Sequence, residues 1–67
     1  MKLLLNGEAV EVEVEAATLA DLLERTGFGG AKVATAVNGS FVAAPARAGH
    51  VLAQDDRVEV LAPMQGG

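Results

Sequence analysis

A change in hydrophobic period early in the chain constrains the fold more than any other feature of the sequence. From Val10 to Glu15, valine and glutamate alternate strictly, which predicts a strand with its valines on one face. Leu19, Leu22 and Leu23 then follow at the spacing i, i+3 and i+4, which predicts a helix with one apolar stripe. An apolar strand face must be covered, and the leucine stripe can cover it.

Two Asn-Gly pairs, Asn6-Gly7 and Asn38-Gly39, divide the rest of the chain. Asn-Gly favours the two-residue turn of a β-hairpin, because both residues tolerate a positive φ. Each pair therefore predicts two antiparallel strands. The strands expected on either side of these turns are Lys2–Leu5, Val10–Glu15, Lys32–Val37 and Ser40–Val42.

The helix and the last strand have their own boundary signals. Thr18 is a good N-cap, and Gly27 is a good stop, so the helix is expected from Leu19 to Thr26. Residues 43–49 are expected to form a loop, after which Val51 and Leu52 return to the core. A turn at residues 54–56 then leads into an alternating strand over residues 57–60.

The predicted architecture follows from this order of elements. A helical crossover allows the last strand to lie parallel to the first. The fold class is therefore α+β: a mixed sheet of about four to five strands curled around one main helix, which is the ubiquitin-like β-grasp arrangement. Residues 1–62 are expected to form the domain and residues 63–67 a flexible tail. The expected core is Leu3, Leu5, Val10, Val12, Val14, Leu19, Leu22, Leu23, Val58 and Val60.

Composition excludes several classes of function. The chain of 67 residues has no cysteine and a single histidine, which argues against a thiol nucleophile and a metal site. Nine acidic residues against five basic ones give a net charge of −4, a poor basis for binding nucleic acid. No apolar run reaches the length of a membrane span. The expected compartment is the cytoplasm.

No catalytic site is predicted within the domain. His50 falls in a loop and Ser40 in a hairpin, so they do not form a nucleophile and base. The glutamates of the alternating strand point outward, which is typical of a solvated face. We expect no catalytic residue, no bound cofactor and no metal.

The sequence end offers a different chemistry. Pro63 stops the last strand, because it has no N–H for a ladder, and the chain ends in Gly66-Gly67. Two glycines without Cβ atoms allow the backbone to enter a narrow channel and present a terminal carboxylate. The alternative is an inert, frayed end.

A partner surface is also predicted on the open side of the sheet. Leu4 and Leu61 have the opposite parity to the core residues of their strands. If the first and last strands are neighbours, these two leucines form an apolar spot that a partner can contact.

The whole chain resembles the ThiS family, the ubiquitin-like sulfur carriers of thiamine biosynthesis. The resemblance rests on Leu3-Leu4-Leu5-Asn6-Gly7, on Thr18-Leu19 with Leu22-Leu23, and on Val37-Asn38-Gly39. Its most specific part is the ending Pro63-Met64-Gln65-Gly66-Gly67, which follows the last strand. The loop at residues 43–49 departs from the family pattern, which often has Pro-Arg and Trp there.

The resemblance implies a carrier rather than an enzyme. In the family, a ThiF-like adenylating enzyme uses ATP to form an acyl adenylate on the terminal glycine, here Gly67. Sulfur from a cysteine desulfurase or another donor then gives a thiocarboxylate, which supplies thiazole synthase (ThiG-like). Met64, Gln65 and Gly66 would form the tail that reaches these partners. Alternatives are a molybdopterin-synthase small subunit, a protein modifier, or a β-grasp binding module with an inert tail.

Overall fold

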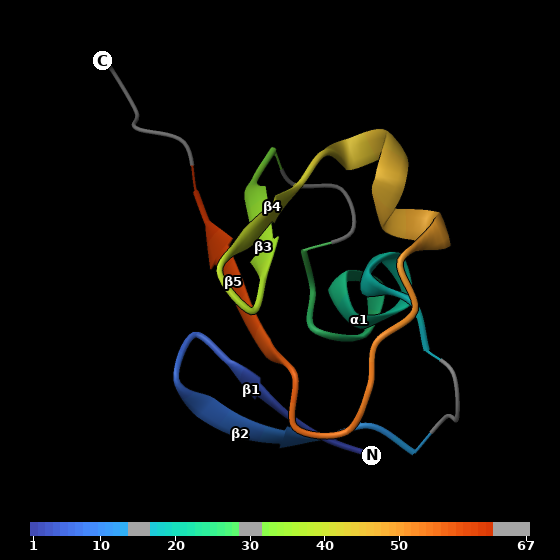
Figure 1. Cartoon of the computed structure of the whole chain (residues 1–67), viewed down its shortest axis with the longest axis vertical. Helices are drawn as coiled ribbons and strands as arrows, with labels where there is room; N and C mark the ends of the chain where they lie inside the picture. Colours follow the sequence, from blue (N-terminus) through green and yellow to red (C-terminus); the bar gives the residue numbers. More distant parts are fainter. Residues whose placement is uncertain (14–16, 29–31, 63–67) are drawn as a thin grey trace.

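The computed structural model describes residues 1–13, 17–28 and 32–62 of the chain. Figure 1 shows one curved sheet with the helix α1 lying against its concave side. The five strands are ordered β2-β1-β5-β3-β4. β1 and β5 are parallel, and every other neighbouring pair is antiparallel. The predicted α+β fold, a mixed sheet around one main helix, is confirmed.

The first hairpin is confirmed, but its second strand is shifted from the predicted range. β1 spans Lys2–Leu5 and β2 spans Glu8–Glu11, whereas the alternation predicted a strand from Val10 to Glu15. The two-residue turn places Glu8 directly opposite Leu5, so pairing starts at once. The strand pairing ends at Lys2↔Glu11, and backbone bonding continues one residue further: the N–H of Val12 donates to the Met1 carbonyl at 2.8 Å, and the amino group of Met1 donates to the Val12 carbonyl at 2.7 Å. Residues 14–16 lie outside the described part of the chain.

The helix α1 spans Leu19–Arg25, one residue shorter than predicted. Thr18 caps it: the N–H of Asp21 donates to Thr18 Oγ1 at 3.1 Å, and the N–H of Thr18 donates to the Asp21 carboxylate at 3.0 Å. This reciprocal pair is a capping box. Gly27 adopts φ +90° after the last turn, which is the left-handed end that glycine favours.

The second half of the chain completes the sheet. β3 spans Ala34–Val37, β4 spans Ser40–Val42 and β5 spans Arg57–Leu61. β5 lies between β1 and β3, at the centre of the sheet. Residues 43–49 were predicted to be a loop, but Ala44–Gly49 form the 3-10 helix η1. Pro45 favours this start because its fixed φ suits the first turn of a helix.

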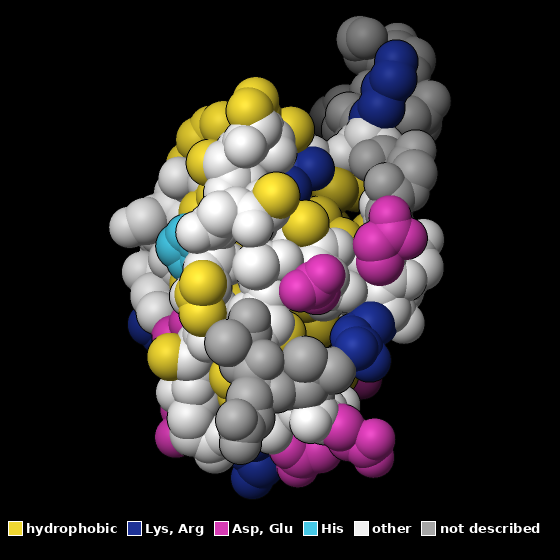
Figure 2. Space-filling view, turned by 90° about the vertical axis from the view of Figure 1, so that its right-hand side faces the viewer, with side chains coloured by type: hydrophobic (Ala, Val, Ile, Leu, Met, Phe, Trp, Pro, Cys, Tyr) yellow, Lys and Arg dark blue, Asp and Glu magenta, His cyan; other side chains and the backbone are white. Residues whose placement is uncertain are grey.

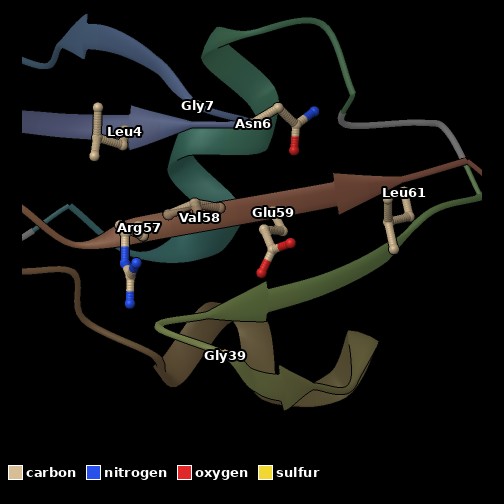
Figure 3. Close-up of a pocket in the computed structure, with 8 residues that line it drawn as sticks. All are labelled: Leu4, Asn6, Gly7, Gly39, Arg57, Val58, Glu59 and Leu61. Atoms are coloured by element: carbon tan, nitrogen blue, oxygen red, sulfur yellow. The ribbon is translucent and has the colours of Figure 1, made fainter.

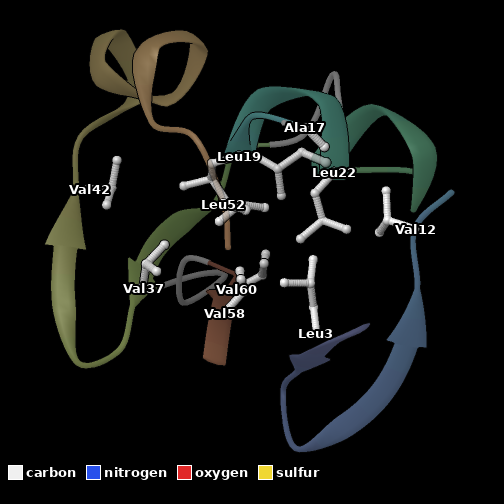
Figure 4. Close-up of a cluster of buried hydrophobic side chains, with 11 residues drawn as sticks. Leu3, Val12, Ala17, Leu19, Leu22, Val37, Val42, Leu52, Val58 and Val60 are labelled. Carbon is white, nitrogen blue, oxygen red and sulfur yellow. The ribbon is translucent and has the colours of Figure 1, made fainter. Parts of the chain in front are cut away.

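The core lies between the sheet and α1, as Figure 4 shows. Seven of the predicted core residues are buried: Leu3, Val12, Leu19, Leu22, Leu23, Val58 and Val60. Leu5 and Val10 are only partly buried and pack at the margin of the cluster, because Val10 lies on the edge strand β2 and Leu5 is the last residue of β1. Val14 lies outside the described residues.

The core also contains residues outside the expected set of ten. Val37, Val42 and Leu52 are buried. Val51 was expected to return to the core with Leu52 but is 59% exposed, because adjacent residues of an extended segment point in opposite directions. Thr35 is 1% exposed, and its hydroxyl donates to the carbonyl of Val42 at 2.7 Å.

Candidate functional site

The strand that leads to the predicted tail is held on both of its edges. β5 pairs with β1 through Leu4↔Arg57 and Leu5↔Val58. On its other edge it pairs with β3 up to Ala34↔Leu61. The predicted tail residues Met64, Gln65, Gly66 and Gly67 lie outside the described residues. The sheet therefore fixes the chain up to the end of β5, directly before the tail begins.

Leu4 and Leu61 face the open side of the sheet, but they do not form the contiguous spot that was expected. Leu4 lies beside Arg57, and Leu61 is four residues further along β5, or about 13 Å at the rise of a strand. Both line one open groove of about 550 Å³. Figure 3 shows them at its two ends, with Arg57 beside Leu4 and Glu59 between the two leucines. Their predicted role in partner binding stays a prediction.

Leu61 also lines a smaller hollow together with a second large apolar side chain, Phe41. Leu61 is 63% exposed and Phe41 is 71% exposed. The volume of this hollow is about 130 Å³, and Ala34 and Ala36 of β3 and Glu59 of β5 also line it. We call Ala34, Ala36, Phe41 and Leu61 the open-face patch. An exposed apolar cluster of this kind is typical of a protein-binding site.

The sequence contained a signal for Phe41 that was missed. Val42 points into the core, so Phe41, its neighbour in β4, must point to the open face. Phe41 pairs with Ala36 and Leu61 pairs with Ala34. The two alanines have small side chains, so Phe41 on one side of β3, and Glu59 and Leu61 on the other, leave a hollow between them. Recognising the patch required the strand order, which placed β3 between β4 and β5.

A second groove, of about 600 Å³ and largely apolar, is lined by Leu61 on one side and by η1 on the other. Its wall includes Ala44 and Arg47 of η1. Arg47 Nε donates to Thr35 Oγ1 at 2.9 Å, and its Nη2 donates to the Val33 carbonyl at 2.6 Å. These bonds fix η1 against β3 on the side of the sheet that the buried Thr35 faces, so the segment that departs from the family pattern has a defined place.

The surface on the helix side has a different character. Figure 2 shows hydrophobic side chains in the upper part of this face, at the height of η1, and acidic and basic side chains interspersed below. The alanines of η1 at positions 44, 46 and 48 are exposed. No field of one sign of charge covers the face in this view.

Among the titratable side chains of the described residues, Asp21 has a clear structural role. Hydrogen bonds from the backbone and side chain of Thr18 hold the pKa of the Asp21 carboxyl below its ordinary value. His50 is half-buried after η1, and its carbonyl accepts the N–H of Leu19 at 2.9 Å. Among residues 1–13, 17–28 and 32–62, no cluster of side chains could hold a metal ion. No helix of the described part is long and apolar enough to cross a membrane.

The comparison with protein families decides what the chain is related to. The model of the ThiS family matches residues 3–67. The chain belongs to the ThiS family. The match extends over the described domain and the predicted tail, including Gly66 and Gly67. Membership of this family supports a role as a sulfur carrier in thiamine biosynthesis.

Two solved structures are similar to this ThiS-family chain. A crystal structure of the thiamine biosynthesis protein ThiS from Geobacter metallireducens is 29% identical, covers both chains fully and has a TM-score of 0.87. A solution NMR structure of a thiamine biosynthesis protein from the same organism is 28% identical, with a TM-score of 0.80. That match covers 100% of this chain and 88% of the other. No curated protein matches the chain.

Proposed function

We propose that this ThiS-family chain carries sulfur as a thiocarboxylate on Gly67. The observation that carries the proposal is the family match, which runs through Gly66-Gly67. The proposal requires the carboxylate of Gly67 to be the free end of the chain. The domain itself would act as a co-substrate that presents this group in the cytoplasm, where ATP is available.

The proposed chemistry has three steps before sulfur is delivered. In the first, a carboxylate oxygen of Gly67 attacks the α-phosphorus of ATP in a ThiF-like adenylating enzyme, which releases pyrophosphate and leaves an acyl adenylate. In the second, the outer sulfur of a persulfide, supplied by a cysteine desulfurase or another donor, displaces AMP and gives an acyl disulfide. A thiol of the partner enzymes then attacks the other sulfur of this disulfide, which releases the thiocarboxylate and leaves a disulfide on the partner. Adenylation is needed because a carboxylate is a poor electrophile until one oxygen becomes part of a good leaving group.

Thiazole synthase is the proposed acceptor of the sulfur. The carrier has no cysteine, so its thiocarboxylate cannot form a disulfide with a thiol of its own chain. The sulfur would thus stay available to an external acceptor. No cofactor is required on the carrier, since ATP is bound and used by the adenylating enzyme.

We assign the open-face patch as the surface on which the adenylating enzyme docks. Phe41 and Leu61 are large and exposed, and they surround a hollow that a partner side chain can fill. Leu61 ends β5, so the patch lies at the point from which the tail must extend toward ATP. Docking here would place the tail and the adenylating site on the same side of the carrier.

Pyrophosphate exchange with the adenylating enzyme and ATP tests this proposal. The wild-type chain should support exchange, because formation of the acyl adenylate is reversible. Deletion of Gly67 should abolish it, and so should an extension beyond Gly67, which converts the reactive carboxylate into an amide. Both variants should keep the circular dichroism spectrum of the wild type. Normal exchange by either variant would show that Gly67 is not the acceptor.

A further inference from the structure

The end of β5 extends past its neighbour β1. The last backbone hydrogen bond between these two strands runs from the N–H of Asn6 to the carbonyl of Val58, at 2.9 Å. Val60 lies two residues further along, and its N–H and C=O face the same edge as those of Val58, because the pleat repeats every two residues. β1 has already turned away at Asn6, so its backbone does not reach Val60.

The side chain of Asn6 takes the place of that missing backbone. The N–H of Val60 donates to Asn6 Oδ1 at 2.8 Å, and Asn6 Nδ2 donates to the carbonyl of Val60 at 3.1 Å. A side-chain amide offers the same donor and acceptor as a peptide group, so it continues the ladder beyond the end of β1. Figure 3 shows Asn6 past the end of β1 and alongside the second half of β5.

The second Asn-Gly turn does the same at the other end of β5. The N–H of Arg57 donates to Asn38 Oδ1 at 2.9 Å, and the N–H of Asn38 donates to the carbonyl of Arg57 at 2.7 Å. Asn38 and Asn6 both sit at a positive φ, of 50° and 51° respectively. The two asparagines therefore act alike on one strand. Asn38 holds the first residue of β5, and Asn6 holds Val60, one residue before the end of β5.

We infer that Asn6 is a positioning residue for the carrier tail: it fixes the end of β5 and thereby the direction in which residues 63–67 leave the domain. The inference rests on the proposed function. Adenylation requires the Gly67 carboxylate to reach ATP while the open-face patch is docked. If Val60 lost its hydrogen-bond partner on the β1 edge, the end of β5 would be more mobile. A smaller fraction of docked molecules would then hold the Gly67 carboxylate in a reactive position.

Glycine substitutions at the two turns provide a matched test, because glycine keeps the positive φ and removes only the side chain. Amide hydrogen exchange would report on the N–H of Val60, and pyrophosphate exchange would give kcat and KM. In Asn6→Gly we expect faster exchange at Val60, a kcat lowered roughly tenfold and a KM close to that of the wild type. Both variants should lose a comparable amount in the midpoint of urea unfolding. In Asn38→Gly, however, we expect the amide hydrogen exchange of Val60 and the kcat of pyrophosphate exchange to stay unchanged.

The outcomes distinguish a failure of this inference from a failure of the proposed function. Equal kcat values for Asn6→Gly and wild type, or an equal fall in Asn38→Gly, would overturn the positioning role while leaving Gly67 as the acceptor. If the wild-type chain supports no pyrophosphate exchange, the proposed function and this inference are refuted together. If Asn6→Gly does not fold, Asn6→Asp replaces it: its carboxylate can still accept from Val60 but cannot donate to the carbonyl, so kcat should again fall with KM unchanged.

Discussion

Phe41 and Leu61 face the same side of the sheet from the two strands that flank β3, and both line the hollow above Ala34 and Ala36. These are the two most exposed large hydrophobic side chains of the described residues. Leu61 is the last residue of β5, so this hollow connects an apolar contact surface to the start of the tail.

Aspartate at either position of this pair should weaken binding to the adenylating enzyme. Phe41→Asp and Leu61→Asp would each place a charge against an apolar partner surface, at a cost of about 2 kcal/mol or more if the residue is central to the interface. Titration calorimetry with the enzyme would measure this loss.

Val51→Asp is the matched control, because Val51 is also well exposed but is not part of the open-face patch. Its affinity should equal that of the wild type. Leu4→Asp tests the earlier expectation for Leu4 separately. Wild-type affinity for both Phe41→Asp and Leu61→Asp, in chains that remain folded, would refute the docking surface.

Truncation of the helix stripe should destabilise the domain. Leu23 is buried between α1 and the sheet, so Leu23→Ala should lower the free energy of unfolding by about 2–5 kcal/mol through lost burial and a residual cavity. Urea denaturation measures the change. The same truncation at the exposed Leu61 should alter it by less than about 0.5 kcal/mol. Equal effects at the two positions would contradict the assignment of Leu23 to the core.

The fold was predictable because several local signals agreed. Thr18 with Asp21 marked the helix start, and both Asn-Gly pairs form turns with positive φ at Asn6 and Asn38. The bounds of β2 were not predictable from alternation alone, because pairing with β1 decides them. Alternation continues for as long as one face is apolar, whereas a strand ends where its partner ends.

The candidate site was predictable only in part. The alternation of side chains along β5 predicts that Leu61 faces the open side of the sheet. Which side chains lie beside it depends on the register of β3 against β5. The same alternation, with the two strands adjacent, predicts one apolar spot formed by Leu4 and Leu61. The parallel register separates the two leucines along β5. The role of Asn6 beyond its turn could not be read from the sequence, since nothing local indicates that its side chain reaches Val60.

The helix cap predicts a specific dependence of stability on pH. The folded-state pKa of Asp21 is below its ordinary value of 3.8, because its carboxylate accepts hydrogen bonds from Thr18. Its stabilisation is therefore present above pH 3.8 and is lost as the pH falls through the lower folded pKa. Compared with Asp21→Asn, the wild type should lose more stability over this acid range. Parallel curves of unfolding free energy against pH would contradict the cap's role.

A methyl group on the last residue should affect the reaction but not the domain. Gly67→Ala should leave the urea midpoint and the affinity for the adenylating enzyme unchanged, because residue 67 lies beyond the sheet and the open-face patch. It should sharply lower kcat for pyrophosphate exchange, since a Cβ restricts the backbone and fills the channel that the tail enters. An unchanged kcat would show that the channel does not require glycine at this position.

Intact-mass spectrometry of the chain purified from cells that contain the adenylating enzyme and the sulfur donor tests the central claim most directly. The account predicts a species heavier by the replacement of one oxygen with one sulfur, confined by fragmentation to Gly67 and lost on hydrolysis. This species should be absent when the adenylating enzyme is deleted. A chain that carries only the unmodified carboxylate, or that is found joined through Gly67 to lysines of other proteins, would contradict the account.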